Sequence, residues 1–66
     1  KYHLSFDYTI MNDVMMVVKQ HNCTVLLQEL QLFCEMVIGI PRSAEELCLI
    51  RLKDIYGLDV RRQNPS

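Results

Sequence analysis

The sequence carries almost no excess of charge of either sign. Seven Lys and Arg residues stand against eight Asp and Glu residues in a chain of 66, which leaves a formal net charge of −1. A domain that binds nucleic acid by itself usually carries a basic patch or stripe, and an anionic membrane attracts the same kind of surface. The charge balance therefore counts against both functions for this chain alone.

Long hydrophobic runs and closely spaced cysteines are also missing. The longest apolar runs, 14–18 and 36–40, are far shorter than the roughly 20 residues of a membrane span. We expect no signal peptide, since the sequence opens on a strand-like pattern. Cys23, Cys34 and Cys48 lie too far apart for a C-x-x-C metal or redox motif. We therefore expect a cytoplasmic protein with no membrane partner and with reduced, mostly buried cysteines.

The length and composition fit one small packed domain. Sixty-six residues exclude a large barrel, a full dinucleotide-binding fold and a two-domain enzyme. Half of the residues are hydrophobic and 23% are charged, which excludes a disordered tail. Composition, together with the periodicity described next, predicts a small soluble α+β module but does not identify its function.

Hydrophobic periodicity predicts the elements of the first half. The alternation from Tyr2 to Tyr8 predicts a strand with four residues on its buried face, namely Tyr2, Leu4, Phe6 and Tyr8. A helix is expected over 10–21 with Thr9 as its N-cap, followed by Asn22 in a left-handed conformation. Strands are expected over 24–30 and 33–40, and Pro41 ends the second of them.

The second half begins with a capping signature. Ser43-Ala44-Glu45-Glu46 is a capping box and predicts the start of a second helix. Its buried arc should hold Cys48, Leu49, Leu52, Ile55 and Tyr56. Gly57 should end this helix, and 58–60 should form a final edge strand. We therefore expect one domain over residues 1–60 and a frayed tail over 61–66.

This βαββαβ order predicts a ferredoxin-like α+β sandwich. Right-handed crossovers place both helices on one face of a four-stranded antiparallel sheet with strand order 4-1-3-2. The other face of the sheet stays open.

The loop after the first strand lacks the residues of several known sites. Residues 7–12 contain no C-x-x-C, no glycine and no arginine, which disfavours a soft-metal chaperone, a phosphate-binding nest and an anion loop like that of acylphosphatase. Base stacking on the open face is also disfavoured, because Phe33 is the only aromatic residue expected there. We expect no cofactor, no metal and no enzymatic activity.

The titratable residues allow few alternatives. His3 and His21 fall in different places, on the open face and at a helix end, so a metal or acid/base pair is the weaker interpretation. Asp7 and Glu35 could form an acid/base pair on neighbouring strands of the open face. The basic doublet at 61–62 is interpreted as a solvated tail, with a phosphate contact as the alternative.

Three apolar residues do not fit the amphipathic pattern of the helices. Met16, Leu47 and Ile50 fall on the polar sides, where they are either scattered or form a patch covered by another domain or a second copy. Together with the open face and Arg61 of the tail they complete the candidate interaction surface: His3, Ser5, Met16, Glu35, Val37, Leu47, Ile50 and Arg61.

Several segments resemble the C-terminal domain of the bacterial IMPACT/YigZ family over residues 2–60. They are Phe6-Asp7-Tyr8, the helix beginning near Asn12, Thr24-Val25-Leu26-Leu27-Gln28-Glu29, the strand end Ile40-Pro41 and Leu52-Lys53-Asp54-Ile55-Tyr56-Gly57. The resemblance implies a ferredoxin-like domain similar to the C-terminal domains of elongation factor G. It also implies a larger N-terminal domain related to ribosomal protein S5, which we expect to be missing here because Lys1 is not a natural start.

The resemblance further implies a non-catalytic accessory domain. Its expected partners are the S5-like domain of the same chain and RNA or the ribosome, in translation-related regulation. No functional residue carries over, because the matching positions are structural. The alternative is a protein-interaction or homodimerisation module that does not bind nucleic acid.

Overall fold

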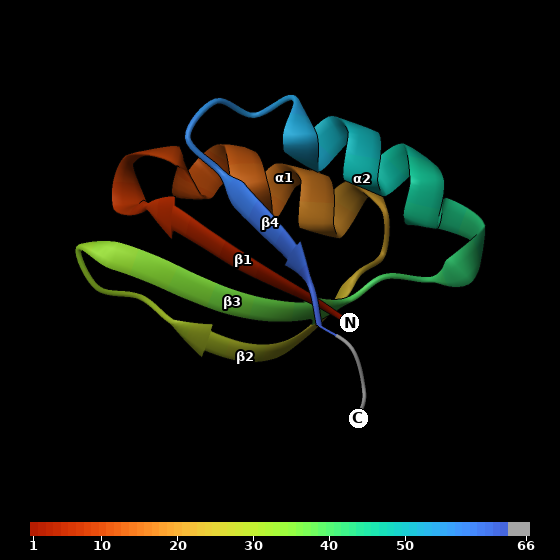
Figure 1. The fold of residues 1–66 in the computed structure, drawn as a ribbon, viewed down its shortest axis with the longest axis horizontal. Helices are drawn as coiled ribbons and strands as arrows, with labels where there is room; N and C mark the ends of the chain where they lie inside the picture. The colour runs from red at the N-terminus through yellow and green to blue at the C-terminus, as the bar shows by residue number, and fades with distance from the viewer. Residues whose placement is uncertain (64–66) are drawn as a thin grey trace.

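The computed structural model describes residues 1–63, which form a four-stranded antiparallel sheet and two helices (Figure 1). The sheet order is β2-β3-β1-β4, which confirms the predicted topology and the ferredoxin-like α+β fold. The main elements are β1 (Tyr2–Asp7), α1 (Met11–Gln20), β2 (Thr24–Glu29), β3 (Phe33–Gly39), α2 (Glu45–Lys53) and β4 (Asp59–Arg62), with short 3-10 turns at Tyr8–Ile10 and Arg42–Ala44.

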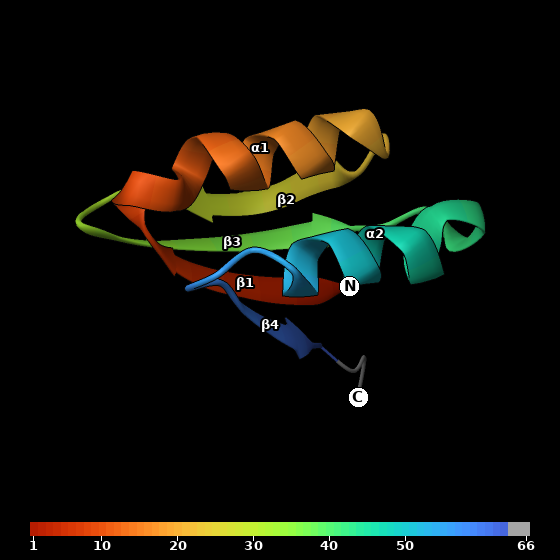
Figure 2. The same cartoon turned by 90° about the horizontal axis from the view of Figure 1, so that it is seen from above.

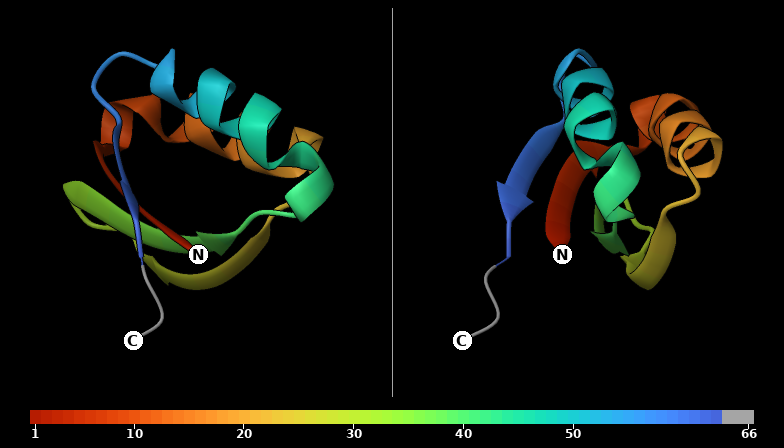
Figure 3. Two further views of the ribbon diagram at one scale, coloured as in Figure 1. Left: turned by 45° about the vertical axis from the view of Figure 1, so that its right-hand side comes forward. Right: turned by 90° about the vertical axis from the view of Figure 1, so that its right-hand side faces the viewer.

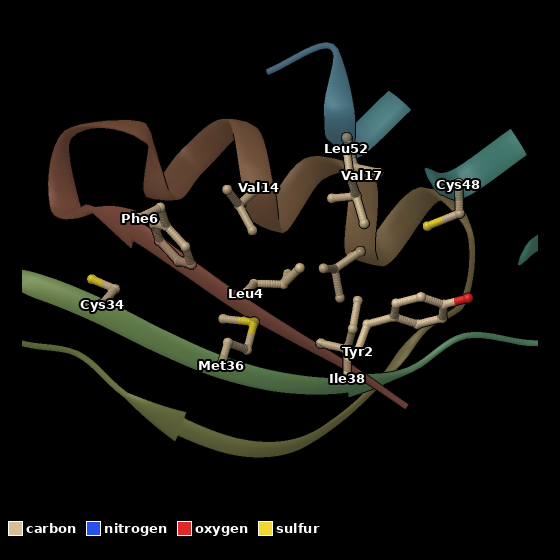
Figure 4. Packing of buried hydrophobic residues seen from close by; sticks show 11 residues of the cluster. Tyr2, Leu4, Phe6, Val14, Val17, Cys34, Met36, Ile38, Cys48 and Leu52 are labelled. Atoms are coloured by element: carbon tan, nitrogen blue, oxygen red, sulfur yellow. The ribbon is translucent and has the colours of Figure 1, made fainter. Parts of the chain in front are cut away.

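Both helices cover the same face of the sheet and pack beside each other (Figures 2 and 3). The core lies between the two layers and is built mainly from alternate residues of the two central strands. β1 supplies Tyr2, Leu4 and Phe6, and β3 supplies Cys34, Met36 and Ile38. Figure 4 shows these side chains below residues of α1 and α2, among them Val14 and Leu52.

The first strand ends one residue earlier than its alternation predicts. Tyr8 begins a 3-10 turn and is 57% exposed, so the prediction that it lies in the core is wrong. The predicted cap at Thr9 is also wrong, because Asp7 Oδ1 accepts a hydrogen bond from the Thr9 backbone N–H at 2.9 Å. The helix then runs within the predicted range, and Asn22 after it has the expected left-handed φ of 56°.

The second helix begins without the predicted capping box. Ser43 lies in a 3-10 turn, Ala44 is the N-cap, and no side chain caps the helix. The turn is closed instead by the Ala44 N–H, which donates to the Pro41 carbonyl. Tyr56 lies beyond the end of α2 and is 96% exposed, which corrects its predicted burial. Gly57 has the expected positive φ, at 91°.

The last strand is longer than predicted, so the domain does not end at residue 60. Arg61 and Arg62 belong to β4, opposite His3 and Tyr2 of β1, and Gln63 N–H donates to the Lys1 carbonyl. Backbone pairing with the central strand thus orders polar residues that were expected to fray. Residues 64–66 of that expected tail lie outside the described residues.

A partly buried hydrogen bond joins the sheet to α2. The Tyr2 hydroxyl, in a side chain that is only 6% exposed, donates to Glu45 Oε2 at 2.7 Å. This hydrogen bond is the main cause that raises the pKa of Tyr2 above its ordinary value of 10.0, and burial adds to it. The neutral phenol is therefore the form that the fold stabilises.

Replacing Phe6 by Ala should lower the free energy of unfolding by about 3–5 kcal/mol, because the side chain is fully buried and a cavity would remain. That is a large part of the stability of so small a domain. Urea unfolding measures the loss, with Tyr56→Ala as an exposed aromatic control. Equal stabilities of the two variants would contradict the position of β1 in the core.

Replacing Tyr2 by Phe should cost about 1 kcal/mol near neutral pH, because Glu45 loses its donor. A raised phenol pKa in the folded state means that this stabilisation is complete below pH 10 and is lost as pH rises through the folded pKa. The difference between wild type and Tyr2→Phe should therefore shrink above pH 10. Tyr8→Phe is the exposed control, and a difference that stays constant with pH would refute the assignment.

Candidate functional site

The sheet face away from the helices, called here the outer face, brings five of the predicted residues together. The register places His3 between Val37 of β3 and Arg61 of β4. In the next outward row, Ser5 lies between Glu35 and Asp59. Because alternate residues of a strand share a face, these side chains form two adjacent rows across the sheet.

The outer face is more acidic than basic. The row of Ser5 continues on β2, where Glu29 lies opposite Glu35, so three carboxylates occupy one row. The basic groups lie beside carboxylates: His3 Nε2 is 3.6 Å from Glu35 Oε1, and the Arg61 Nε–H donates to Asp59 Oδ2 at 3.1 Å. This arrangement repels phosphate more than it attracts it.

A β-bulge in β2 adds two leucines to the outer face. The register passes from Val25 opposite Ile38 to Leu27 opposite Val37, so one extra residue, Leu26, is inserted. A side chain at Gly39, on the outer face, would have its Cβ 3.9 Å from Leu26 Cδ1, which places Leu26 on that face too. Leu26 and Leu27 are 49% and 57% exposed, whereas Val37 is buried.

Sequence reasoning missed these leucines. Strict alternation allows only one of two adjacent residues to face outward, and the segment contains no glycine that would indicate a bulge. The available signal was the pair of adjacent leucines, Leu26-Leu27. Two consecutive apolar residues interrupt the alternation of a strand that sequence analysis places at the edge of the sheet.

A second apolar feature lies at one end of the sheet, where two loops meet. The Tyr8 N–H donates to the Leu32 carbonyl at 3.3 Å, and a hollow forms there. It is lined by Asp7, Tyr8, Thr9, Leu30, Gln31 and Leu32. The Asp7 carboxylate in this hollow already accepts a hydrogen bond from the Thr9 N–H, and this bond lowers the pKa of Asp7. The hollow therefore offers apolar contact rather than acid/base chemistry.

The three apolar residues on the helices are exposed as predicted, each by more than half. Leu47 and Ile50 line one shallow pocket with Ser43 and Glu46, whereas Met16 is not among its lining residues. Leu47 and Ile50 of α2 therefore lie together, and Met16 of α1 does not share their pocket.

The titratable residues do not assemble into a predicted catalytic or metal site. Asp7 is opposite Phe33 and caps the 3-10 turn, while Glu35 contacts His3. His21 follows α1, and its Nε2 is buried with no hydrogen-bond partner among the described residues. Across residues 1–63 no three His, Cys, Asp or Glu side chains are grouped so as to hold a metal.

The three cysteines carry free thiols. Cys34 and Cys48 are buried as predicted, and Cys23 is partly exposed. Cys34 Sγ–H donates to the Gln31 carbonyl, whereas Cys23 and Cys48 contact each other.

Within the described part of the chain, neither helix has the length and apolar character needed to cross a membrane. No family model matches the sequence, and neither the curated proteins nor the solved structures include a match. The resemblance to the IMPACT/YigZ family therefore stays a prediction.

Proposed function

We propose that this chain is a non-catalytic protein-interaction module that associates with a second copy of itself. The observation that carries the proposal is the position of its exposed apolar residues. Eleven large hydrophobic side chains are exposed among the described residues, and six of them lie in one β-hairpin: Val25, Leu26, Leu27, Leu30, Leu32 and Phe33. We call residues 25–33 the apolar hairpin.

Such clustering is typical of interaction sites. Single exposed apolar residues are common on soluble proteins, whereas contiguous ones are rare unless something covers them. The two edge strands of the sheet also differ in charge. β4 carries Asp59, Arg61 and Arg62, whereas Glu29 is the only charged residue of β2. Charges on an edge oppose association. The β4 edge is thus protected, and the β2 side favours contact.

The mixed charge of the outer face favours a second copy as the partner. A two-fold interface uses one patch twice, so the patch must complement itself. Beside the leucines this face presents the carboxylates of Glu29, Glu35 and Asp59 and the basic groups of His3 and Arg61. Two copies can therefore bury their leucines and still bring opposite charges together.

The size of the surface is sufficient for a dimer. A standard interface buries about 800 Å² per partner, and the chain exposes 4840 Å² in total. One face of the molecule can supply about a sixth of that surface. The bulge distorts the ladder of β2, which disfavours edge-to-edge pairing and favours packing through the hairpin and the outer face.

The resemblance to the IMPACT/YigZ family supports an accessory rather than a catalytic role. An S5-like domain of the same chain could cover this surface in place of a second copy, and that alternative predicts a monomer. Docking on RNA or the ribosome has less support, because the outer face is acidic and its cations lie next to carboxylates.

Sedimentation velocity across a range of concentrations tests self-association. We expect the wild-type chain to shift from monomer to dimer, and Leu27→Glu to stay monomeric because a carboxylate would be buried in the interface. Leu47→Glu is the matched control, since Leu47 is 52% and Leu27 is 57% exposed. A wild type that stays monomeric at all concentrations, or a dimer that only Leu47→Glu dissociates, would refute the proposal.

Titration with single-stranded and duplex RNA at low salt tests the alternative partner. We expect no saturable binding at tens of micromolar, because phosphate contacts require unopposed cations. Salt-sensitive binding that Arg61→Ala weakens, and that Leu27→Glu leaves unchanged, would instead favour nucleic-acid docking.

A further inference from the structure

Two of the three cysteines meet although they are distant in sequence. Cys23 Sγ lies 3.6 Å from Cys48 Sγ, across 25 positions of the chain. Cys23 follows the turn that ends α1, and Cys48 projects from α2 into the core (Figure 4). Cys34 lies near the opposite end of the sheet, since it pairs with Phe6, whereas Cys23 precedes the residue that pairs with Gly39.

We propose that Cys23 and Cys48 form a reversible oxidation site, which closes an intramolecular disulfide by exchange with a small disulfide such as oxidised glutathione. The two sulfurs are already in van der Waals contact. A disulfide bond needs them about 2.0 Å apart, so the pair must close by about 1.6 Å. Cys23 belongs to no helix or strand, so a shift there need not break the pairing of β2 with β3.

The chemistry proceeds in two exchange steps. Cys23 is the more exposed thiol of the pair, so its thiolate attacks one sulfur of the small disulfide, and the other sulfur leaves as a thiolate. Cys48 then loses its proton and attacks the Cys23 sulfur of the mixed disulfide, which expels the second small thiol. The two protein thiols lose two electrons and two protons in all, and the small disulfide gains them and becomes two thiols.

The environments of the two sulfurs explain why Cys23 attacks first and Cys48 second. Burial raises the pKa of the Cys48 thiol to about 12, and the hydrogen bond and charge of Cys23 add to the effect. Cys48 is therefore a poor first nucleophile, because the thiolate is the attacking form. It can still resolve a mixed disulfide on Cys23, since the contact between the two side chains makes the second step intramolecular.

A Cys23–Cys48 bond would tie the start of β2 to α2. The closed loop contains β2, β3 and the beginning of α2. Cross-linking a loop of this length restricts the unfolded chain and so stabilises the folded one. The thermal unfolding midpoint of the oxidised form should rise by on the order of 10 °C.

Incubation of the reduced chain with oxidised glutathione tests the proposal. Trypsin cleaves after Lys19, Arg42 and Arg51, so the disulfide should link peptides 20–42 and 43–51 in a non-reducing mass map. We expect this link in wild type and in Cys34→Ser, with the loss of two hydrogen atoms per chain. It should be absent from Cys23→Ser and Cys48→Ser, and Cys48→Ser should stop at the mixed disulfide on Cys23.

Circular dichroism checks that each variant is folded. Because Cys48 is fully buried, its serine variant could unfold, and the partly exposed Cys23→Ser then provides the same test. A wild type that stays reduced, that accumulates only the mixed disulfide, or that links through Cys34 would overturn the proposal.

Discussion

The burial of one side of β1 is the constraint on which the rest of the structure depends. This strand pairs on both edges, with β3 and with β4, and its inner residues Tyr2, Leu4 and Phe6 carry the contact with the helices. Side chains alternate along a strand, so the same register fixes His3 and Ser5 on the outer face. The core and the candidate site are therefore opposite sides of one strand, and a slip of one residue would exchange them.

The parts of the fold that local chemistry determines could be predicted from the sequence. The alternation of β1, the helical period of α1 and the left-handed positions of Asn22 and Gly57 all follow from steric and solvation preferences of neighbouring residues. The errors lie at the first and last residues of the elements. Tyr8 continues the apolar alternation after the backbone has already turned, and Arg61 belongs to a strand because of its pairing with distant His3.

The candidate site was predictable only in part, for the same reason. His3 and Glu35 could be placed on the outer face because their strands alternate regularly. Leu26 and Leu27 could not, because a bulge depends on how β2 and β3 fit together and leaves little trace in composition. Nor does the net charge of −1 show that the acidic groups share a row while Arg61 lies beside Asp59. The arrangement of charge, rather than its sum, separates a protein partner from a nucleic-acid partner.

The oxidation site and the interaction surface involve the same weak element. β2 pairs with β3 alone, and all six of its residues are exposed, so it is held by fewer buried contacts than the central strands. Such edge elements open at a lower free energy than the core. A bond from Cys23 would hold the beginning of β2, while a partner on the apolar hairpin would cover its middle and its far end. The two proposed events therefore stabilise the same strand at different places, and because they share no residue each can act without the other.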